Sequence, residues 1–194
     1  MNLDSQTSIE DFIFIRDYSV SSQHCRELIK FFEDNPKLHH KGETGDGKGK
    51  TSTDITIGPE HSKLPKYQKI LGPFMEALTV GNEDYIKHYS VSLDRISRFS
   101  LYQFFNIQAY KVGERFYGWH SESSSKRTAG RKLVWMFYLN DVPSGGTEFL
   151  NQNLTTEALE GRLVIWPADW THTHRGQEGA KIKKYILTGW MTFD

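Results

Sequence analysis

The sequence is short of cysteine, of net charge and of long apolar runs, and each shortage excludes a class of protein. Its one cysteine, Cys25, cannot form a disulfide within the chain, which favours a reducing compartment over a disulfide-stapled scaffold. Lysine and arginine number 24, and aspartate and glutamate number 24. Nucleic acid is therefore an unfavoured partner, because no excess of positive charge points to it.

The longest apolar run, residues 133–139, is far shorter than the roughly 20 residues that cross a bilayer. The first residues also lack the basic and apolar regions of a secretory signal peptide. We therefore expect a cytoplasmic protein with no membrane partner.

What the sequence does contain is enough for one folded domain. A chain of 194 residues fits one domain, and 13% aromatic residues argue against disorder. We expect one domain over residues 1–194. Residues 1–97 would form a helical N-terminal part, and residues 98–194 would form a β core with the active site.

Helical periodicity marks the first half. Cys25, Leu28, Ile29 and Phe32 follow the i, i+3, i+4, i+7 spacing and predict an amphipathic helix over residues 19–34. A second apolar stripe begins near residue 59.

Pro65 and Pro73 are expected to break this second stripe into short pieces, and residues 82–90 add a third short helix. Residues 41–50 (KGETGDGKGK) are rich in glycine and lysine and predict a mobile loop. This loop is either a solvated connector or a segment that closes over a substrate.

The second half is rich in β-branched and aromatic residues, with Gly, Pro and Asn between the runs. Strands are predicted over residues 99–110, 131–139, 161–166 and 184–193. Several short strands without long helices between them favour a mainly β sandwich or jelly roll. The fold expected is a β core supported by N-terminal helices.

Three histidines of this half suggest metal chemistry. His120 and Glu122 stand at i and i+2, which in extended backbone places both side chains on one face. A third ligand from His172 or His174 would complete a two-histidine, one-carboxylate set, which is typical of non-haem Fe(II) oxygenases. Taken alone, each histidine could equally be a core or surface residue.

Several linked motifs raise the metal hypothesis. In order along the chain they are residues 108–122 (QAYKVGERFYGWHSE), 137–140 (FYLN), 145–149 (GGTEF), 161–166 (GRLVIW), 174–176 (HRG), 184–185 (KY) and 188–190 (TGW). Together they resemble the 2-oxoglutarate/Fe(II)-dependent dioxygenase superfamily, and within it the prolyl 4-hydroxylase-like branch. The resemblance covers about residues 98–194 and implies a double-stranded β-helix core of jelly-roll or cupin-like form.

The resemblance also implies roles. His120, Glu122 and His174 would be the catalytic metal ligands. His172 shares the strand parity of His174, which predicts that it lines the pocket. Lys184 would pair with the distal carboxylate of 2-oxoglutarate, the alternative being a solvated lysine at a strand start. The hydroxyls of Tyr110 and Tyr138 would bind the same cosubstrate, with simple core packing as the alternative for each. Fe(II) would be the metal, with 2-oxoglutarate and O₂ as cosubstrates and ascorbate as a further candidate cofactor.

Two features depart from the family pattern or fall outside it. Glu122 stands where the family has aspartate, and its extra methylene moves the carboxylate and adds a rotor. The polar loop 123–130 follows it, and in or beside this loop Arg127 or Arg131 either contacts substrate or lies on a solvated face.

The function implied is hydroxylation of a C–H bond, with a peptidyl proline in a peptide or protein as the substrate and succinate and CO₂ as products. Alternatives stay open: a hydroxylase of a free amino acid or other small molecule, and a catalytically silent β-barrel binding module. A redox-inert metal enzyme of cupin type would leave Lys184 unexplained. Zero net charge and Lys184 both disfavour a nucleic-acid demethylase.

Overall fold

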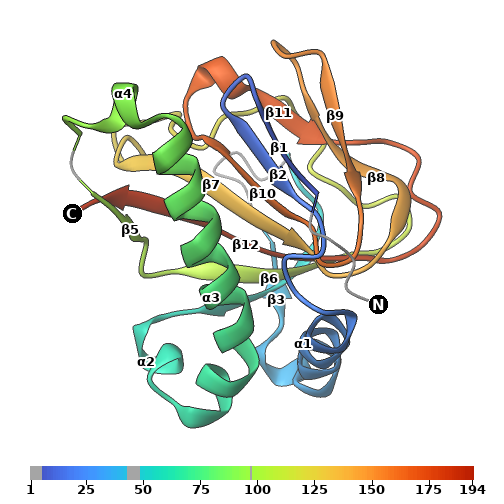
Figure 1. The fold of residues 1–194 in the computed structure, drawn as a ribbon. Helices are drawn as coiled ribbons and strands as arrows, with labels where there is room; N and C mark the ends of the chain where they lie inside the picture. Colours follow the sequence, from blue (N-terminus) through green and yellow to red (C-terminus); the bar gives the residue numbers. More distant parts are fainter. Residues whose placement is uncertain (1–5, 43–48, 97) are drawn as a thin grey trace.

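The computed structural model describes residues 6–42, 49–96 and 98–194, and a large antiparallel sheet lies at its centre (Figure 1). The sheet has nine strands, which are β1 (Thr7–Glu10), β2 (Ile13–Arg16), β3 (His40–Lys41), β4 (Thr53–Ile57), β5 (Phe99–Leu101), β6 (Phe105–Tyr110), β7 (Arg131–Tyr138), β10 (Leu163–Pro167) and β12 (Lys184–Phe193). Their order is β1-β2-β10-β7-β12-β6-β4-β3, with β5 paired to β12. We call this the major sheet.

A three-stranded minor sheet in the order β11-β8-β9 faces one side of the major sheet. Its strands are β8 (Val142–Phe149), β9 (Leu154–Ala158) and β11 (His174–Gly176). Phe149 and Ala158 of the minor sheet pack with Val134, Val164 and Trp166 of the major sheet in one buried cluster. The two facing sheets confirm the predicted jelly-roll β core.

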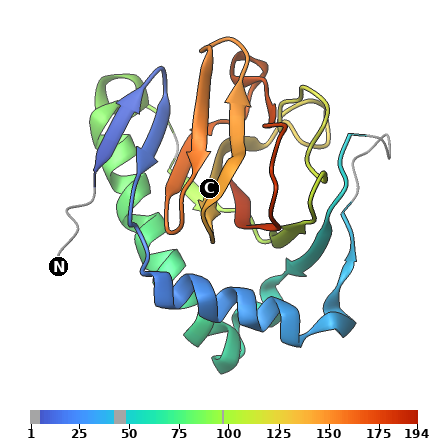
Figure 2. The ribbon, with the colours of Figure 1, turned by 90° about the vertical axis from the view of Figure 1, so that its right-hand side faces the viewer.

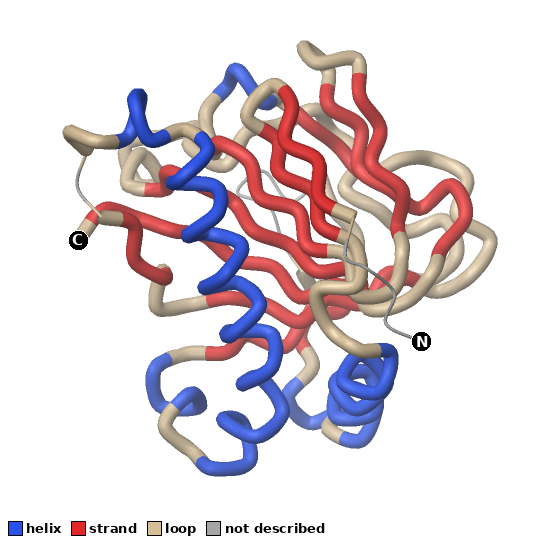
Figure 3. Tube along the Cα trace, viewed as in Figure 1, coloured by secondary structure: helices blue, strands red, loops and turns tan. Residues whose placement is uncertain are grey.

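Helices cover the opposite face of the major sheet (Figures 1 and 3). They are α1 (Ser22–Asp34), α2 (Pro59–Ser62), α3 (Pro65–His88) and α4 (Ser90–Leu93), with short 3-10 turns at Pro36–Leu38 and Trp170–His172. The α1 helix begins at the Ser21 cap, whose hydroxyl accepts from the His24 amide, and lies across one end of the molecule (Figure 2). Its apolar side packs into the same core as Trp135 and Phe137 of the sheet.

The N-terminal part differs from the helical segment predicted for residues 1–97, because it also supplies β1 to β4. The β2 strand pairs with β10, and β4 pairs with β6, so both extend the major sheet. These strands have two to five residues. Such short runs carry too little alternation to be predicted, and their pairing with distant strands stabilises them.

The helix predictions also need correction at Pro73, which lies inside the continuous helix α3 instead of breaking it. Interior proline costs about 3 kcal/mol, but Leu71, Phe74 and Leu78 are buried against the sheet on both sides of it and outweigh this cost. The helix predicted over residues 82–90 is the end of α3, followed by α4.

Residues 43–48 of the predicted mobile loop lie outside the described residues. In the described ranges, none of the helices is long and apolar enough to span a membrane.

Candidate active site

Two histidines from distant parts of the chain are joined by backbone hydrogen bonds at the mouth of the β core. His120 and His174 form an isolated antiparallel bridge, in which each amide donates to the other's carbonyl at 3.0 and 2.9 Å. This pairing brings their imidazole rings to a centroid distance of 4.2 Å. The bridge therefore selects His174, two residues beyond His172, as the partner of His120.

Each of these two rings is oriented by its second nitrogen. Nδ1 of His120 lies 3.0 Å from the Gly118 carbonyl, and Nδ1 of His174 lies 2.8 Å from the His172 carbonyl. A carbonyl only accepts, so both Nδ1 atoms carry the proton and donate it. Both Nε2 atoms are left with a lone pair, which is the form that binds a metal ion.

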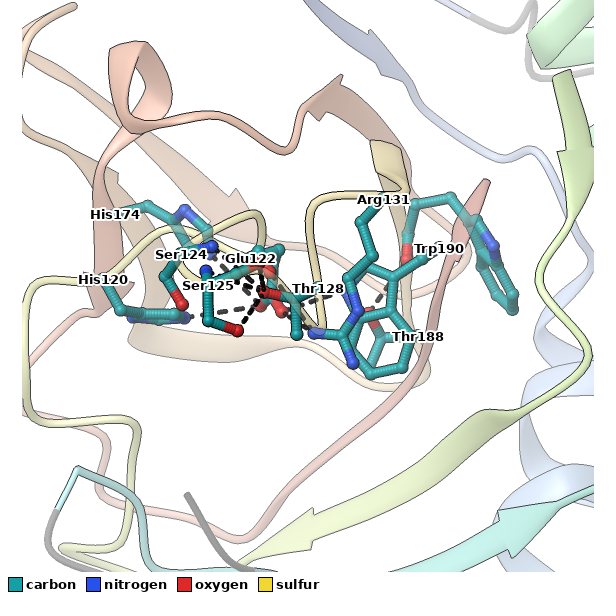
Figure 4. Close-up of polar contacts among 10 residues, drawn as sticks. His120, Glu122, Ser124, Ser125, Thr128, Arg131, His174, Thr188 and Trp190 are labelled. Atoms are coloured by element: carbon teal, nitrogen blue, oxygen red, sulfur yellow. Dashed lines mark hydrogen bonds and ion pairs between the residues drawn. The ribbon is translucent and has the colours of Figure 1, made fainter. Parts of the chain in front are cut away.

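Glu122 completes the cluster (Figure 4). Its Oε1 lies 3.5 Å from Nε2 of His120 and 3.9 Å from Nε2 of His174. One ligand atom from each of the three residues falls within 4.8 Å of the others. Two imidazoles and a carboxylate in this arrangement fit divalent iron and leave further coordination positions free.

The charges around the triad favour the ionisation states that bind a metal cation. Burial alone would raise the pKa of Glu122, but a hydrogen bond and the positive charge from His120, when protonated, together with the charges of protonated His174 and of Arg131, lower this pKa to about 2. Burial, together with repulsion from His120, lowers the pKa of His174 to about 4. At neutral pH the carboxylate is therefore ionised and His174 is neutral.

His172 faces elsewhere. Its Nε2 lies 2.8 Å from the carbonyl of Asp11, and its Nδ1 lies 3.0 Å from the Thr171 hydroxyl. It is buried and is not among the residues that line the cavity beside the triad. The pocket-lining position that strand parity predicted for His172 is wrong, because it ends the 3-10 turn Trp170–His172 instead of continuing β11.

The triad opens into a cavity of about 860 Å³ between the two sheets, which extends over β6 and β4 to β3. A cavity of this size accommodates a small cosubstrate together with part of a second molecule. Its walls include Val134, Met136 and Ile186, and its floor on β4 and β6 is polar.

Lys184 lies in this cavity as a buried cation with 6% exposure. Its Nζ donates to the Gly145 carbonyl at 2.7 Å, and no carboxylate of the described residues forms an ion pair with it. Burial, with a smaller effect of Arg115, lowers its pKa to about 8. A buried ammonium group without an anionic partner fits a bound carboxylate.

Tyr110 also lines the cavity, but its hydroxyl has a partner within the protein. The hydroxyl donates to Oε1 of Gln108 at 2.7 Å, and Nε2 of Gln108 donates to Asp54 at 3.2 Å. Asp54 in turn accepts from Lys50 at 2.6 Å and Ser52 at 2.7 Å. Because the Asp54 carboxylate only accepts, Gln108 must turn its carbonyl toward Tyr110, so that Tyr110 presents lone pairs to any further partner.

Tyr138 is fully buried and is not among the residues that line the cavity. Its hydroxyl lies 2.8 Å from that of Thr147 and 2.9 Å from that of Thr156. These contacts link β7 of the major sheet to β8 and β9 of the minor sheet. Of the two predicted tyrosines, the structure brings only Tyr110 to the cavity surface.

Sequence reasoning named Arg131 as a substrate contact or a solvated residue, whereas the structure places it part-buried against Glu122. It missed the other residues that hold Glu122 and Tyr110. Arg131 and Trp190 both contact Oε2 of Glu122, and Asp54 and Gln108 form the polar chain behind Tyr110. One sequence signal could have identified Trp190, namely its place in the motif 188–190, which follows Lys184. Asp54 had none, because its strand could not be recognised.

The comparisons with known proteins agree with this geometry. The family model described as the 2OG-Fe(II) oxygenase superfamily matches residues 105–192, which include the triad and Lys184. No sequence match to a curated protein is found.

Solved structures share the fold at low sequence identity. A viral collagen prolyl hydroxylase from Paramecium bursaria Chlorella virus-1 has a TM-score of 0.68 and 14% identity, covering 95% of this chain and 97% of its own. A Pseudomonas putida prolyl-4-hydroxylase has a TM-score of 0.68 and 16% identity, covering 94% and 93%. A Trichoplax adhaerens prolyl hydroxylase, solved with a peptide fragment of the hypoxia inducible factor oxygen degradation domain, has a TM-score of 0.73 and 13% identity, covering 94% and 84%.

Proposed function

Because the chain belongs to the 2OG-Fe(II) oxygenase superfamily and is a 2-oxoglutarate-dependent dioxygenase, we propose that it hydroxylates a prolyl residue of a peptide. The products would be the hydroxylated peptide, succinate and CO₂. One observation carries the proposal: a single cavity joins the triad His120, Glu122 and His174 to the buried ammonium group of Lys184, which forms no ion pair with a carboxylate of the described residues.

The triad would hold Fe(II). Both histidines offer an unprotonated Nε2, and Glu122 supplies one negative charge. When bound, the iron supplies the activation of O₂ that no protein side chain can perform. The protein's own task is to hold the three ligand atoms, to orient the cosubstrates and to exclude water from the reacting groups.

Lys184 would bind the distal carboxylate of 2-oxoglutarate. The ammonium group is already fixed by the Gly145 carbonyl, so little rotamer freedom is lost on binding. Val134, Met136 and Ile186 line the same cavity and would keep water from the cosubstrate. Tyr110 would lie beside the cosubstrate, with its proton committed to Gln108.

The cavity leaves room for a substrate side chain beyond the 2-oxoglutarate site. Trp190 and Trp119 both line it, and Trp119 is 40% exposed, with Arg175 stacked at 4.3 Å from its ring centroid. Aromatic faces suit an apolar ring such as that of proline. The peptide in the Trichoplax structure also supports a peptide as the substrate class.

The proposal can be tested by incubating the protein with Fe(II), 2-oxoglutarate, O₂ and a set of proline-containing peptides, with and without ascorbate. Mass spectrometry should detect one added oxygen atom per modified peptide, with succinate formed in equal amount. His174→Ala should abolish both products. Succinate coupled to a free amino acid, with unmodified peptides, would instead identify a small-molecule hydroxylase. Bound metal without any turnover of 2-oxoglutarate would leave a silent binding module.

A further inference from the structure

The two oxygens of the Glu122 carboxylate face different partners (Figure 4). Oε1 faces the Nε2 atoms of the two histidines. Oε2 accepts two hydrogen bonds, one from Nη1 of Arg131 at 2.9 Å and one from Nε1 of Trp190 at 2.9 Å. One oxygen is thus held by the protein, and the other is left for the metal.

The two donors also hold each other. The guanidinium carbon of Arg131 lies 3.6 Å from the centroid of the Trp190 ring, which is a close cation–π stack. Arg131 and Trp190 therefore form a single packed unit with two N–H groups directed at one oxygen. We call this pair the Arg–Trp clamp.

A local irregularity of the sheet places Arg131 in the clamp. In the pairing of β7 with β12, Leu133 stands opposite Met191, but Arg131 stands opposite Thr192, so that Lys132 is an extra residue. Without this bulge Arg131 would share the parity of Leu133 and Trp135, which face the helices. The bulge turns Arg131 to the cavity face, where Trp190 lies.

The backbone of Glu122 is anchored as well. Its amide donates to the Ala168 carbonyl at 3.0 Å, and the next amide, of Ser123, donates to the same carbonyl at 2.9 Å. With the backbone fixed, the length of the side chain decides how far the carboxylate reaches. A glutamate at this position contacts the clamp with one oxygen and faces the histidines with the other.

We propose that Arg131 and Trp190 are positioning residues for the metal ligand Glu122, and that their clamp selects glutamate at a position where the family has aspartate. The clamp holds Oε2, which removes the extra rotor of glutamate and directs Oε1 to the metal. An aspartate here would end one methylene short and lose the clamp. The inference rests on the proposed function only in taking the triad as a metal site.

The test measures the affinity for Mn²⁺ alone by titration calorimetry, without 2-oxoglutarate. Trp190→Phe removes the N–H group but keeps an aromatic face under Arg131, and Arg131→Met removes the guanidinium group. Each should weaken Mn²⁺ binding by about 10- to 100-fold, as loss of such supporting hydrogen bonds does at other metal sites. Trp170→Phe and Lys132→Met are matched controls, because Trp170 is 73% exposed and Lys132 stacks on Phe193.

A second comparison tests the selection of glutamate. Glu122→Asp should weaken Mn²⁺ binding strongly in the native background and much less in Trp190→Phe, because the clamp is already broken there. Thermal unfolding of the metal-free variants distinguishes positioning of Glu122 from a purely structural role of the clamp. A purely structural role would lower the melting temperature and leave the Mn²⁺ affinity of the folded protein unchanged.

Native Mn²⁺ affinity in folded Trp190→Phe, or an equal loss in Trp170→Phe, would overturn the proposal. If the Arg131→Met variant does not fold, the Mn²⁺ affinity of Trp190→Phe alone tests the proposal. A protein that binds Mn²⁺ with the predicted pattern but modifies no prolyl peptide would contradict the proposed substrate and leave the clamp standing.

Discussion

The two faces of the major sheet are both buried, but charged side chains of its central strands line the cavity on one face only. On the helix side, Trp135 and Phe137 of β7 and Leu187 of β12 belong to an apolar cluster with α1 and α3. On the cavity side, the same two strands present the charged groups of Arg131 and Lys184 beside apolar residues such as Val134 and Ile186. Alternation along a strand lets one face stabilise the fold while the other carries charge that would destabilise an ordinary core.

This difference predicts that a substitution on one face changes the property that this face controls and leaves the property controlled by the other face unchanged. The cavity face should control binding of metal and cosubstrate, and the helix face should control the free energy of unfolding. Four measurements would break or sharpen this separation.

The largest effect is expected from the histidines. His120→Ala and His174→Ala should each abolish metal binding and turnover, because each removes one of three ligands. His172→Ala, only two residues away, should keep both, since its ring bonds to the Asp11 carbonyl. Metal content by atomic absorption and succinate formation would be compared for the three variants. Loss of metal in His172→Ala alone would refute the assignment of ligands.

On the helix face, Phe137→Ala should lower the free energy of unfolding by about 3–5 kcal/mol, because it leaves a cavity in a fully buried aromatic cluster. Urea unfolding followed by tryptophan fluorescence measures this loss. The folded fraction should bind Mn²⁺ with native affinity. A parallel loss of affinity would show that the two faces are coupled.

On the cavity face, Lys184→Met should raise the 2-oxoglutarate concentration needed for half-maximal succinate formation by about 100-fold, since a buried carboxylate loses its partner. The free energy of unfolding of the ligand-free protein should not fall, because the buried ammonium group has no ion-pair partner among the described residues. Lys184→Arg keeps the charge and should lose less. Native cosubstrate dependence in Lys184→Met would remove Lys184 from the site.

The smallest effect is a pH dependence. Burial lowers the pKa of Lys184 to about 8. A carboxylate binds to the protonated form, so 2-oxoglutarate affinity should be constant below pH 8 and fall about tenfold per pH unit above it. Binding titrations between pH 6.5 and about 9.5 in the native protein and in Lys184→Met would show the difference. An equal fall in both proteins would assign the titration to another group.

Local patterns in the sequence predicted the elements whose signal is contained in a short window. The helix over residues 19–34 appears as α1, and the strand predicted over residues 184–193 is β12 with the same bounds. His120 and Glu122 were paired by their spacing, and the structure brings both together with His174. In each case neighbouring residues carry the information, because periodicity and i, i+2 spacing are properties of the local chain.

The features that sequence reasoning missed depend on distant pairing. The β4 strand is short, and only its pairing with β6 places Asp54 behind Gln108 and Tyr110. Pro73 was expected to end a helix, but the burial of its neighbours against the sheet decides otherwise. Tyr138 was placed at the cosubstrate by motif alone, and the packing of the minor sheet covers it.

The sequence by itself determined the kind of chemistry, because the ligand types, their order and the cation at position 184 lie in motifs that together resemble one dioxygenase superfamily. Only the tertiary structure decided which residues support that chemistry. Arg131 has the parity of the helix-facing residues, and a single bulge in the pairing of β7 with β12 turns it toward Glu122. A register shift arises from the fit between two strands about 50 residues apart, and the sequence of either strand alone does not contain it.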